Sequence, residues 1–146
     1  MIGAVIAKRL VSGAFAAIER RDVDALVANL ADDAVWEYPG RSAMSGRFEG
    51  KEAIRAQWER WFEGVGRIEF TLEHVAVDNI FALGPSNTLI VEWSAEFEDA
   101  HGTPYQGTGV TVVETEKGKT TRIKEYFSDS EALVEFWGPK EVKATT

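Results

Sequence analysis

The hydrophobic period of this sequence changes near residue 67, and the change restricts the possible folds more than any other feature does. Up to that point apolar residues recur at three- and four-residue spacing, which predicts amphipathic helices. Beyond it apolar and polar residues alternate, which predicts strands with one buried face. Helices followed by an antiparallel meander predict the α+β class. The predicted strands are 67–77, 88–98, 105–116 and 120–128, with glycine-containing turns at 84–87, 101–104 and 117–119.

The first part of the chain predicts two helices and a short strand. Apolar residues at helical spacing over 6–18 predict the first helix, and Asp22 is a suitable N-cap for a second helix buried as far as Leu30. The aromatic segment 34–38 then predicts a strand, and Pro-Gly after it predicts a loop over 39–50.

Two further helices are expected, one on each side of the meander. The longer has an apolar stripe interrupted by one amide, and two glycines mark its end. Ser128 and Glu131 have the spacing of a capping box, which predicts a short closing helix. The stripe of the longer helix consists of Ile54, Gln57, Trp58, Trp61, Phe62 and Val65.

Composition excludes several classes of function. The chain has no cysteine, which rules out disulfides and thiolate chemistry and is compatible with the cytoplasm, the compartment expected here. A net charge of −8 opposes binding to nucleic acid and to anionic membranes. The apolar start 2–10 is too short to span a bilayer. Two distant histidines give no metal-ligand spacing, so neither a metal nor another cofactor is expected.

Four segments carry a family resemblance: Asp22–Leu26, Ala31–Trp36, Gly46–Ile54 and Ile123–Asp129. With the order of elements, they resemble the nuclear transport factor two-like superfamily, which includes ketosteroid isomerases, SnoaL-like polyketide cyclases and limonene epoxide hydrolases. The resemblance implies one SnoaL-like domain over 1–146. Its fold would be a cone-shaped barrel, in which N-terminal helices pack on a curved mixed or antiparallel sheet and enclose one pocket. Dimers are common in such families, so a homodimer is expected.

Individual members of the superfamily match unevenly. Ketosteroid isomerases carry a tyrosine and two aspartates where this chain has Ala14, Tyr38 and Thr111, so their mechanism is not expected. Limonene-type epoxide hydrolases end their last strand with an acidic residue followed by Tyr-Phe, and 125–127 resembles this. Their arginine partner is missing, because the corresponding strand holds Glu and Ser over 92–96.

Glu125 is the first candidate for catalysis. It alternates with Ile123 and Phe127, which predicts a carboxylate on the inward, apolar face of the last strand. Burial would raise its pKa towards neutrality and suit it to general acid or base catalysis. The alternative is a glutamate at the pocket rim or in a salt bridge.

Tyr38 and His74 are further catalytic candidates. Tyr38 precedes Pro39, where isomerase-like families often place a catalytic group, and its phenol would donate a hydrogen bond to a substrate oxygen. His74 continues the face of Phe70 and Leu72 and would relay a proton near neutral pH. The alternative for Tyr38 is a tyrosine that only packs in the core, and the alternative for His74 is a histidine with a purely structural role.

Several residues are expected to contact a substrate. Aromatic side chains of the first strand and the third helix would shape the pocket, and an amide on an apolar helix face must either bond the backbone or face the pocket. The expected substrate-binding residues are Trp36, Gln57, Trp58, Phe62, Glu96, Thr111 and Phe127.

The strand 88–98 allows two orientations. Simple alternation buries Trp93 and Phe97 and leaves Glu92 and Glu96 in water. The family resemblance instead implies that the glutamates face the pocket and that the aromatic residues lie in a dimer interface. Glu96 is therefore a secondary candidate for an acidic residue that contacts the substrate.

Two functions follow from these features. The first is a cofactor-independent enzyme of the isomerase, cyclase, dehydratase or epoxide-hydrolase type, which uses general acid/base catalysis on a small apolar or aromatic molecule. The second is a non-catalytic module that binds an apolar small molecule in the same pocket. A protein-interaction role of the nuclear transport type is a third, less specific reading.

Overall fold

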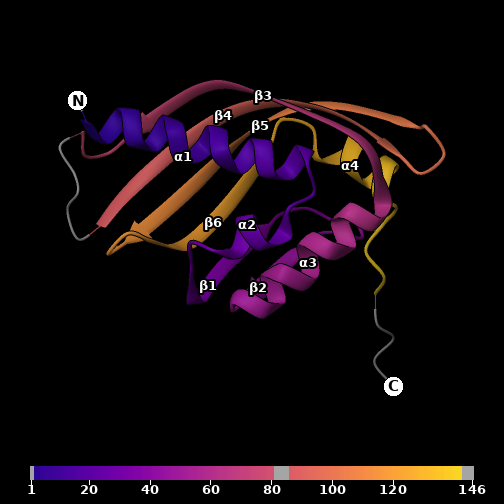
Figure 1. Ribbon diagram of the computed structural model, residues 1–146. Helices are drawn as coiled ribbons and strands as arrows, with labels where there is room; N and C mark the ends of the chain where they lie inside the picture. The colour runs from indigo at the N-terminus through magenta and orange to yellow at the C-terminus, as the bar shows by residue number, and fades with distance from the viewer. Residues whose placement is uncertain (1, 81–85, 143–146) are drawn as a thin grey trace.

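The computed structural model of the protein describes residues 2–80 and 86–142. Figure 1 shows a long, curved sheet with helix α1 lying along it and helices α2 and α3 beyond. The described elements are α1 (Ile2–Glu19), α2 (Val23–Val27), β1 (Leu30–Tyr38), β2 (Gly46–Glu49), α3 (Lys51–Gly64), β3 (Val65–Val77), β4 (Ser86–Asp99), β5 (Pro104–Glu116), β6 (Lys119–Phe127) and α4 (Ser130–Trp137).

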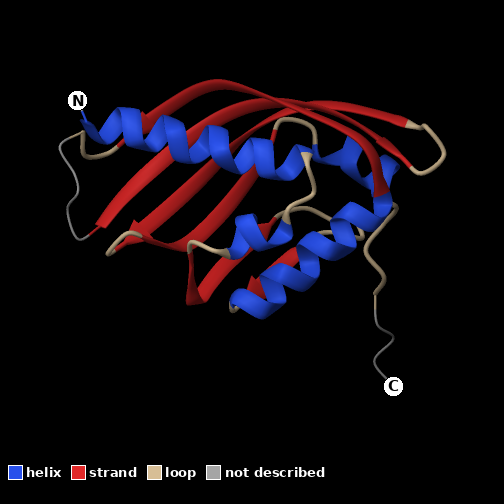
Figure 2. Cartoon of the chain, viewed as in Figure 1, coloured by secondary structure: helices blue, strands red, loops and turns tan. Residues whose placement is uncertain are grey.

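The six strands form one mixed, open sheet in the order β2-β1-β6-β5-β4-β3. Among the described strands, β1 and β6 pair in parallel and the other neighbours pair antiparallel. Because the sheet does not close on itself, the helices complete the enclosure; α1, α2 and α3 all lie on the same side of it (Figure 2). The expected α+β class and cone-shaped fold are confirmed.

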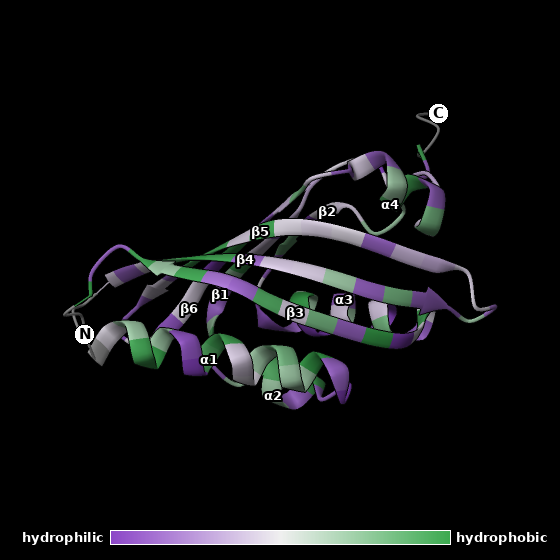
Figure 3. Cartoon of the chain, turned by 90° about the horizontal axis from the view of Figure 1, so that it is seen from above, coloured by the Kyte–Doolittle hydropathy of each residue, from purple (hydrophilic) through white to green (hydrophobic). Residues whose placement is uncertain are grey.

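Alternation determines which face of the meander is buried. Figure 3 shows hydrophilic and hydrophobic residues alternating along β3 and β4. Trp93, Ala95 and Phe97 are buried on the concave face, whereas Glu92 and Glu96 are exposed on the convex face. The orientation implied by the family resemblance is therefore wrong. Trp93 and Phe97 give no support to a dimer interface, and the homodimer stays a prediction.

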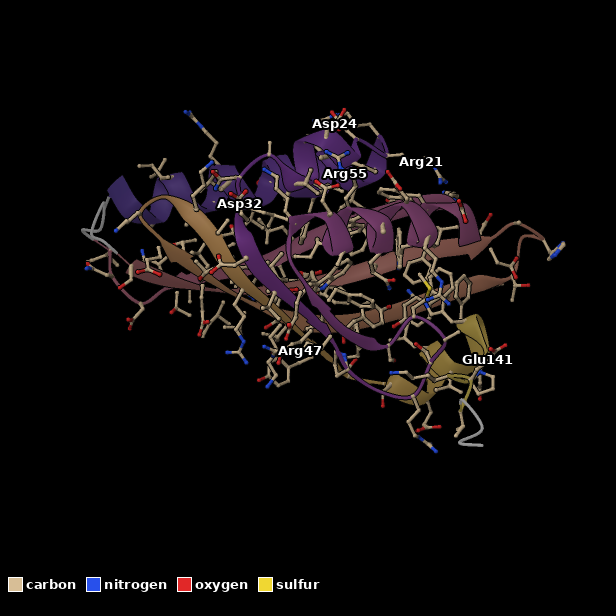
Figure 4. All side chains as sticks on the ribbon, turned by 90° about the horizontal axis from the view of Figure 1, so that it is seen from below. Arg21, Asp24, Asp32, Arg47, Arg55 and Glu141 are labelled. Carbon is tan, nitrogen blue, oxygen red and sulfur yellow. The ribbon has the colours of Figure 1, made fainter. Side chains whose placement is uncertain are left out.

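Arg21 joins the first three helices. Its backbone has the left-handed φ of 58° at the corner between α1 and α2. Its guanidinium donates hydrogen bonds to the carbonyl oxygens of Phe62 (2.7 Å), Val65 (2.6 Å) and Gly66, where α3 ends. Arg55 of α3 also donates to the Asp24 carboxylate of α2 at 2.7 Å, and these residues lie close together in Figure 4. The corner is thus attached to the C-terminal end of α3, where the helix dipole favours a cation.

Some boundaries differ from the expectations. Helix α2 ends at Val27 and β1 already starts at Leu30. Asp22 caps α2 as predicted, because its carboxylate accepts a hydrogen bond from Ala25 N at 3.0 Å. The predicted loop 39–50 contains strand β2, whose short, polar sequence lacks a strand pattern. Of the predicted turn at 84–87, residues 84 and 85 lie outside the described residues.

The closing helix α4 forms, but its cap is Asp129. The Asp129 carboxylate accepts a hydrogen bond from Ala132 N at 3.1 Å, while the Ser128 hydroxyl donates to Thr108 O on β5 at 2.8 Å. The predicted capping residue, Ser128, was therefore one position too early.

Within the described residues, no helix is both long and apolar enough to cross a membrane. The same residues contain no group of three or more side chains placed to hold a metal ion.

Candidate functional site

A cavity of about 1130 Å³ lies between α1 and the concave face of the sheet. Its lining is mostly aliphatic and aromatic, with contributions from α1, α2, α3 and β1 as well as the meander. Small-molecule pockets usually have volumes of about 300–1,000 Å³, so this cavity lies at the large end and has room for a multi-ring or long-chain molecule.

Glu125 lies within this cavity. It is on β6 between the inward-facing Ile123 and Phe127, and it pairs with Thr111 on β5. The Thr111 hydroxyl donates to Glu125 Oε2 at 2.6 Å, and it accepts from Trp93 Nε1 at 2.8 Å. One carboxylate oxygen is therefore held by a hydrogen-bond chain. The other, Oε1, has no hydrogen bond to any residue that the structure describes.

Enclosure by the protein raises the pKa of Glu125 to about 7. Loss of hydration disfavours the charged carboxylate, and this effect exceeds the opposing effects of Thr111 and of the Trp36 indole, which favour ionisation. Trp36 Nε1 is itself fully buried, and among the described residues it has no hydrogen-bond partner of ordinary geometry. A carboxyl group that is half ionised at neutral pH can both accept and return a proton.

Replacing Thr111 with valine tests this hydrogen-bond chain. The variant lacks the hydroxyl that stabilises the ionised carboxylate, so we expect the pKa of Glu125 to rise above 7 by about one pH unit. Nuclear magnetic resonance titration of the glutamate carboxyl carbons measures this change. Thr108→Val, whose hydroxyl contacts Ser128 instead, is the control, and the same pKa in all three proteins would contradict the proposed hydrogen bond.

Tyr38 lies in the same part of the cavity. Its ring packs on Phe127 with centroids 4.8 Å apart and is 6% exposed. Burial, with a smaller contribution from the charge of Glu125, raises the pKa of Tyr38 far above its usual value, while Trp137 and Trp61 partly oppose the rise. The phenol therefore stays protonated and can act as a hydrogen-bond donor.

Glycines on β5 make room for the aromatic lining. A Cβ on Gly109 would lie 2.5 Å from Trp93 Cζ2 and 2.6 Å from Tyr126 O, which are both impossible contacts. Gly109→Ala is therefore expected to displace Trp93, weaken its hydrogen bond to Thr111 and destabilise the fold by roughly 1–3 kcal/mol. Urea unfolding measures the loss. Gly102→Ala is the control: it lies in an open turn with a φ of 81°, so its cost is backbone strain alone, and an equal loss would contradict the packing argument.

Four of the predicted binding residues line the cavity with the catalytic candidates Glu125 and Tyr38: Trp36, Trp58, Thr111 and Phe127. The rings of Trp36 and Trp58 stack with centroids 4.6 Å apart, which connects β1 to α3. Trp36 is 1% exposed, so these rings belong to the core and the cavity wall at once.

His74 lies outside the cavity. A β-bulge between Leu72 and His74 shifts the alternation of β3 by one residue, so that Val75 points inward and the His74 side chain is 82% exposed. Its Nδ1 lies 3.7 Å from Glu92 on the convex face. The predicted inward position of His74 is wrong, because alternation alone does not reveal a bulge.

Three other predicted contact residues do not line the cavity. Gln57 is buried and its amide donates to Met44 O at 3.0 Å, which is the backbone-bonding alternative stated above. Phe62 is buried beside Trp58, with ring centroids 5.5 Å apart, and is not among the residues that line the cavity. Glu96 is on the convex face, where it accepts from Gln106 Nε2 at 3.0 Å.

The sequence reasoning missed three features of the site. Trp93 supplies the donor to Thr111, and alternation along β4 already indicated its inward position. Arg9 and Lys117 line the cavity as well, and no spacing rule would have brought a helix residue and a turn residue together.

The chain matches the SnoaL-like domain family over residues 11–123 and therefore belongs to that family. The expected family resemblance is confirmed. No curated protein sequence matches the chain.

Solved structures share the fold over nearly its whole length. Bal32a, from a soil-derived mobile gene cassette, is 28% identical with a TM-score of 0.78, over 92% of this chain and 98% of its own. TerC co-crystallised with polyporic acid is 19% identical with a TM-score of 0.72, over 89% and 96%. An LEH-like epoxide hydrolase of M. tuberculosis is 22% identical with a TM-score of 0.69, over 92% and 86%.

Proposed function

We propose that this protein is a cofactor-independent enzyme that catalyses proton transfer on an apolar or aromatic small molecule held in the cavity. The observation that carries the proposal is Glu125, a carboxyl group with a pKa of about 7 and one free oxygen inside an apolar cavity. Such a group has the acidity that general acid/base catalysis at neutral pH requires.

In the proposed reaction, ionised Glu125 takes a proton from a substrate carbon beside a carbonyl group, or from a water molecule. Tyr38, which stays protonated, donates a hydrogen bond to the oxygen that gains negative charge. Protonated Glu125 then returns the proton, so the carboxyl group ends as it began. Isomerisation, dehydration, cyclisation and epoxide opening all contain a step of this kind.

The family supports small-molecule chemistry of this sort. One structural neighbour is an epoxide hydrolase and another was crystallised with polyporic acid. The sequence of this chain lacks the arginine of limonene-type epoxide hydrolases on the strand over 92–96. A reaction in which Glu125 alone transfers the proton therefore fits this chain better than a reaction that needs their water-activating triad.

A thermal-shift screen against polyketides, terpenoid epoxides and steroid ketones, each followed by a turnover assay, tests the proposal. A compound that stabilises both the wild type and Glu125→Gln but is converted only by the wild type is the expected result. Compounds that stabilise both proteins without turnover in either would instead favour the non-catalytic binding module.

A further inference from the structure

The cavity lining contains charges of both signs. Among the described residues that line the cavity, the one carboxylate is Glu125, and the two basic side chains are Arg9 of α1 and Lys117 of the β5–β6 turn. Neither basic side chain forms a salt bridge with any residue in the described part of the chain. Both residues are exposed, so both side chains remain available to pair with an anionic group of a ligand.

Arg9 and Lys117 both lie towards the same end of the cavity. At that end a polar row crosses the sheet, because Asn87 pairs with Thr115 and Thr115 pairs with Thr120; we call these three residues the rim. Lys117 follows directly in the turn between β5 and β6. The N-terminal half of α1, which carries Arg9, is attached at the same end, where Gly3 N donates to Ile80 O at 3.1 Å. Figure 1 shows the start of α1 and the β5–β6 turn at the same end of the molecule.

The wall between the rim and Glu125 is apolar. Leu89 pairs with Val113 and Val113 pairs with Ile123, and all three side chains line the cavity. Glu125 is five residues beyond Thr120 on β6, which corresponds to about 16 Å at roughly 3.3 Å per residue. A ligand that reaches from the rim to Glu125 is therefore elongated and apolar over most of its length.

We propose that the cavity binds a long apolar carboxylic acid, whose carboxylate lies at the rim between Arg9 and Lys117 and whose apolar body extends to Glu125. At the rim the carboxylate keeps its hydration and gains two cations, whereas deep in the cavity it would lose hydration and meet the negative charge of Glu125. This distribution of charge orients the ligand and brings one region of it to Glu125. The reaction at that region rests on the proposed function, but the preference for an acid does not.

Binding of the fluorescent polyene cis-parinaric acid and of its methyl ester tests this inference. We expect the wild type to bind the acid roughly tenfold more tightly than the ester in low salt, and salt to reduce the preference. In Arg9→Gln/Lys117→Gln the preference is expected to fall to about twofold or less. The matched control is Lys8→Gln/Lys119→Gln, which changes two neighbouring basic residues that do not line the cavity and removes the same net charge. The control is expected to keep the wild-type preference.

Equal affinity for acid and ester, no binding of either, or an equal loss in both double variants would overturn the inference. Glu125→Gln separates it from the proposed function, because this variant is expected to keep the preference for the acid although it loses turnover. If the wild type showed no preference for the acid but turnover depended on Glu125, only the proposal that the ligand is a carboxylic acid would be overturned. A preserved preference without Glu125-dependent turnover on any compound would overturn only the enzymatic role.

Discussion

Replacing Glu125 with glutamine is expected to lower turnover by roughly 10²–10⁴-fold without unfolding the protein. The amide has nearly the size of the carboxyl group and its oxygen can accept the Thr111 hydrogen bond, but it cannot accept a proton. Measurement of kcat/KM on the compound identified by the screen gives the effect. Glu96→Gln, on the exposed face of β4, is the control and is expected to retain wild-type activity. Undiminished turnover by Glu125→Gln would place proton transfer on another group.

The same substitution is expected to change how stability depends on pH. The pKa of Glu125 is about 7 in the folded protein against 4.5 for a free glutamate, so the unfolded chain releases its proton first as pH rises. The stability that this carboxyl group contributes is fully present below pH 4.5 and is lost as the pH rises through 7, a loss of about 3 kcal/mol. Glu125→Gln lacks this loss, and urea unfolding at pH 5 and pH 8.5 should show a smaller decrease for the variant. Parallel decreases in both proteins would contradict a raised pKa.

Arg21→Ala is expected to destabilise the fold by about 2–3 kcal/mol, the largest effect we expect from a residue outside the cavity. The variant loses three hydrogen bonds to the carbonyl groups at the end of α3 and the contact of the guanidinium with the Phe62 ring, 5.8 Å from its centroid. The expected readout is a lower urea midpoint with an unchanged slope, because the residue acts on stability and not on compactness.

Two further variants separate the side chain of Arg21 from its backbone. Arg21→Gly relieves the left-handed φ of 58° but still lacks the hydrogen bonds, so it is expected to remain destabilised. Arg21→Lys keeps a cation near the helix end without the planar fork, and an intermediate stability is expected. Because arginine and alanine carry the same backbone strain at this φ, the difference between Arg21→Ala and Arg21→Gly measures that strain. Wild-type stability of Arg21→Ala would show that the hydrogen bonds contribute nothing.

Periodicity in the sequence predicted most of the fold, because alternation and helical spacing record which side of each element is buried. It predicted the concave side of β4 correctly at Trp93 and Phe97, where the family resemblance implied the opposite. It failed at His74, because a single extra residue in β3 reverses the face of every residue that follows. It also failed at β2, a strand held by pairing with β1 and not by a pattern of its own.

The candidate site was predictable only in part for a related reason. Glu125 was identified because a carboxylate on an apolar strand face is unusual, and Tyr38 because of its position before Pro39. The hydrogen-bond chain from Trp93 through Thr111 depends on register between β4, β5 and β6, which a single sequence does not specify. The approach of Arg9 to the cavity depends on how α1 lies along β3, and that too is determined by tertiary packing.

The most direct test of a carboxyl group prepared for proton transfer is the titration of Glu125 itself. Carbon-13 resonances of the glutamate carboxyl groups, followed from pH 4 to pH 9, identify its signal as the one missing from Glu125→Gln. The account predicts a midpoint near 7 for this signal. A midpoint near the ordinary glutamate value of 4.5 would contradict it, because the carboxyl group would then be fully ionised at neutral pH and would have no proton to return.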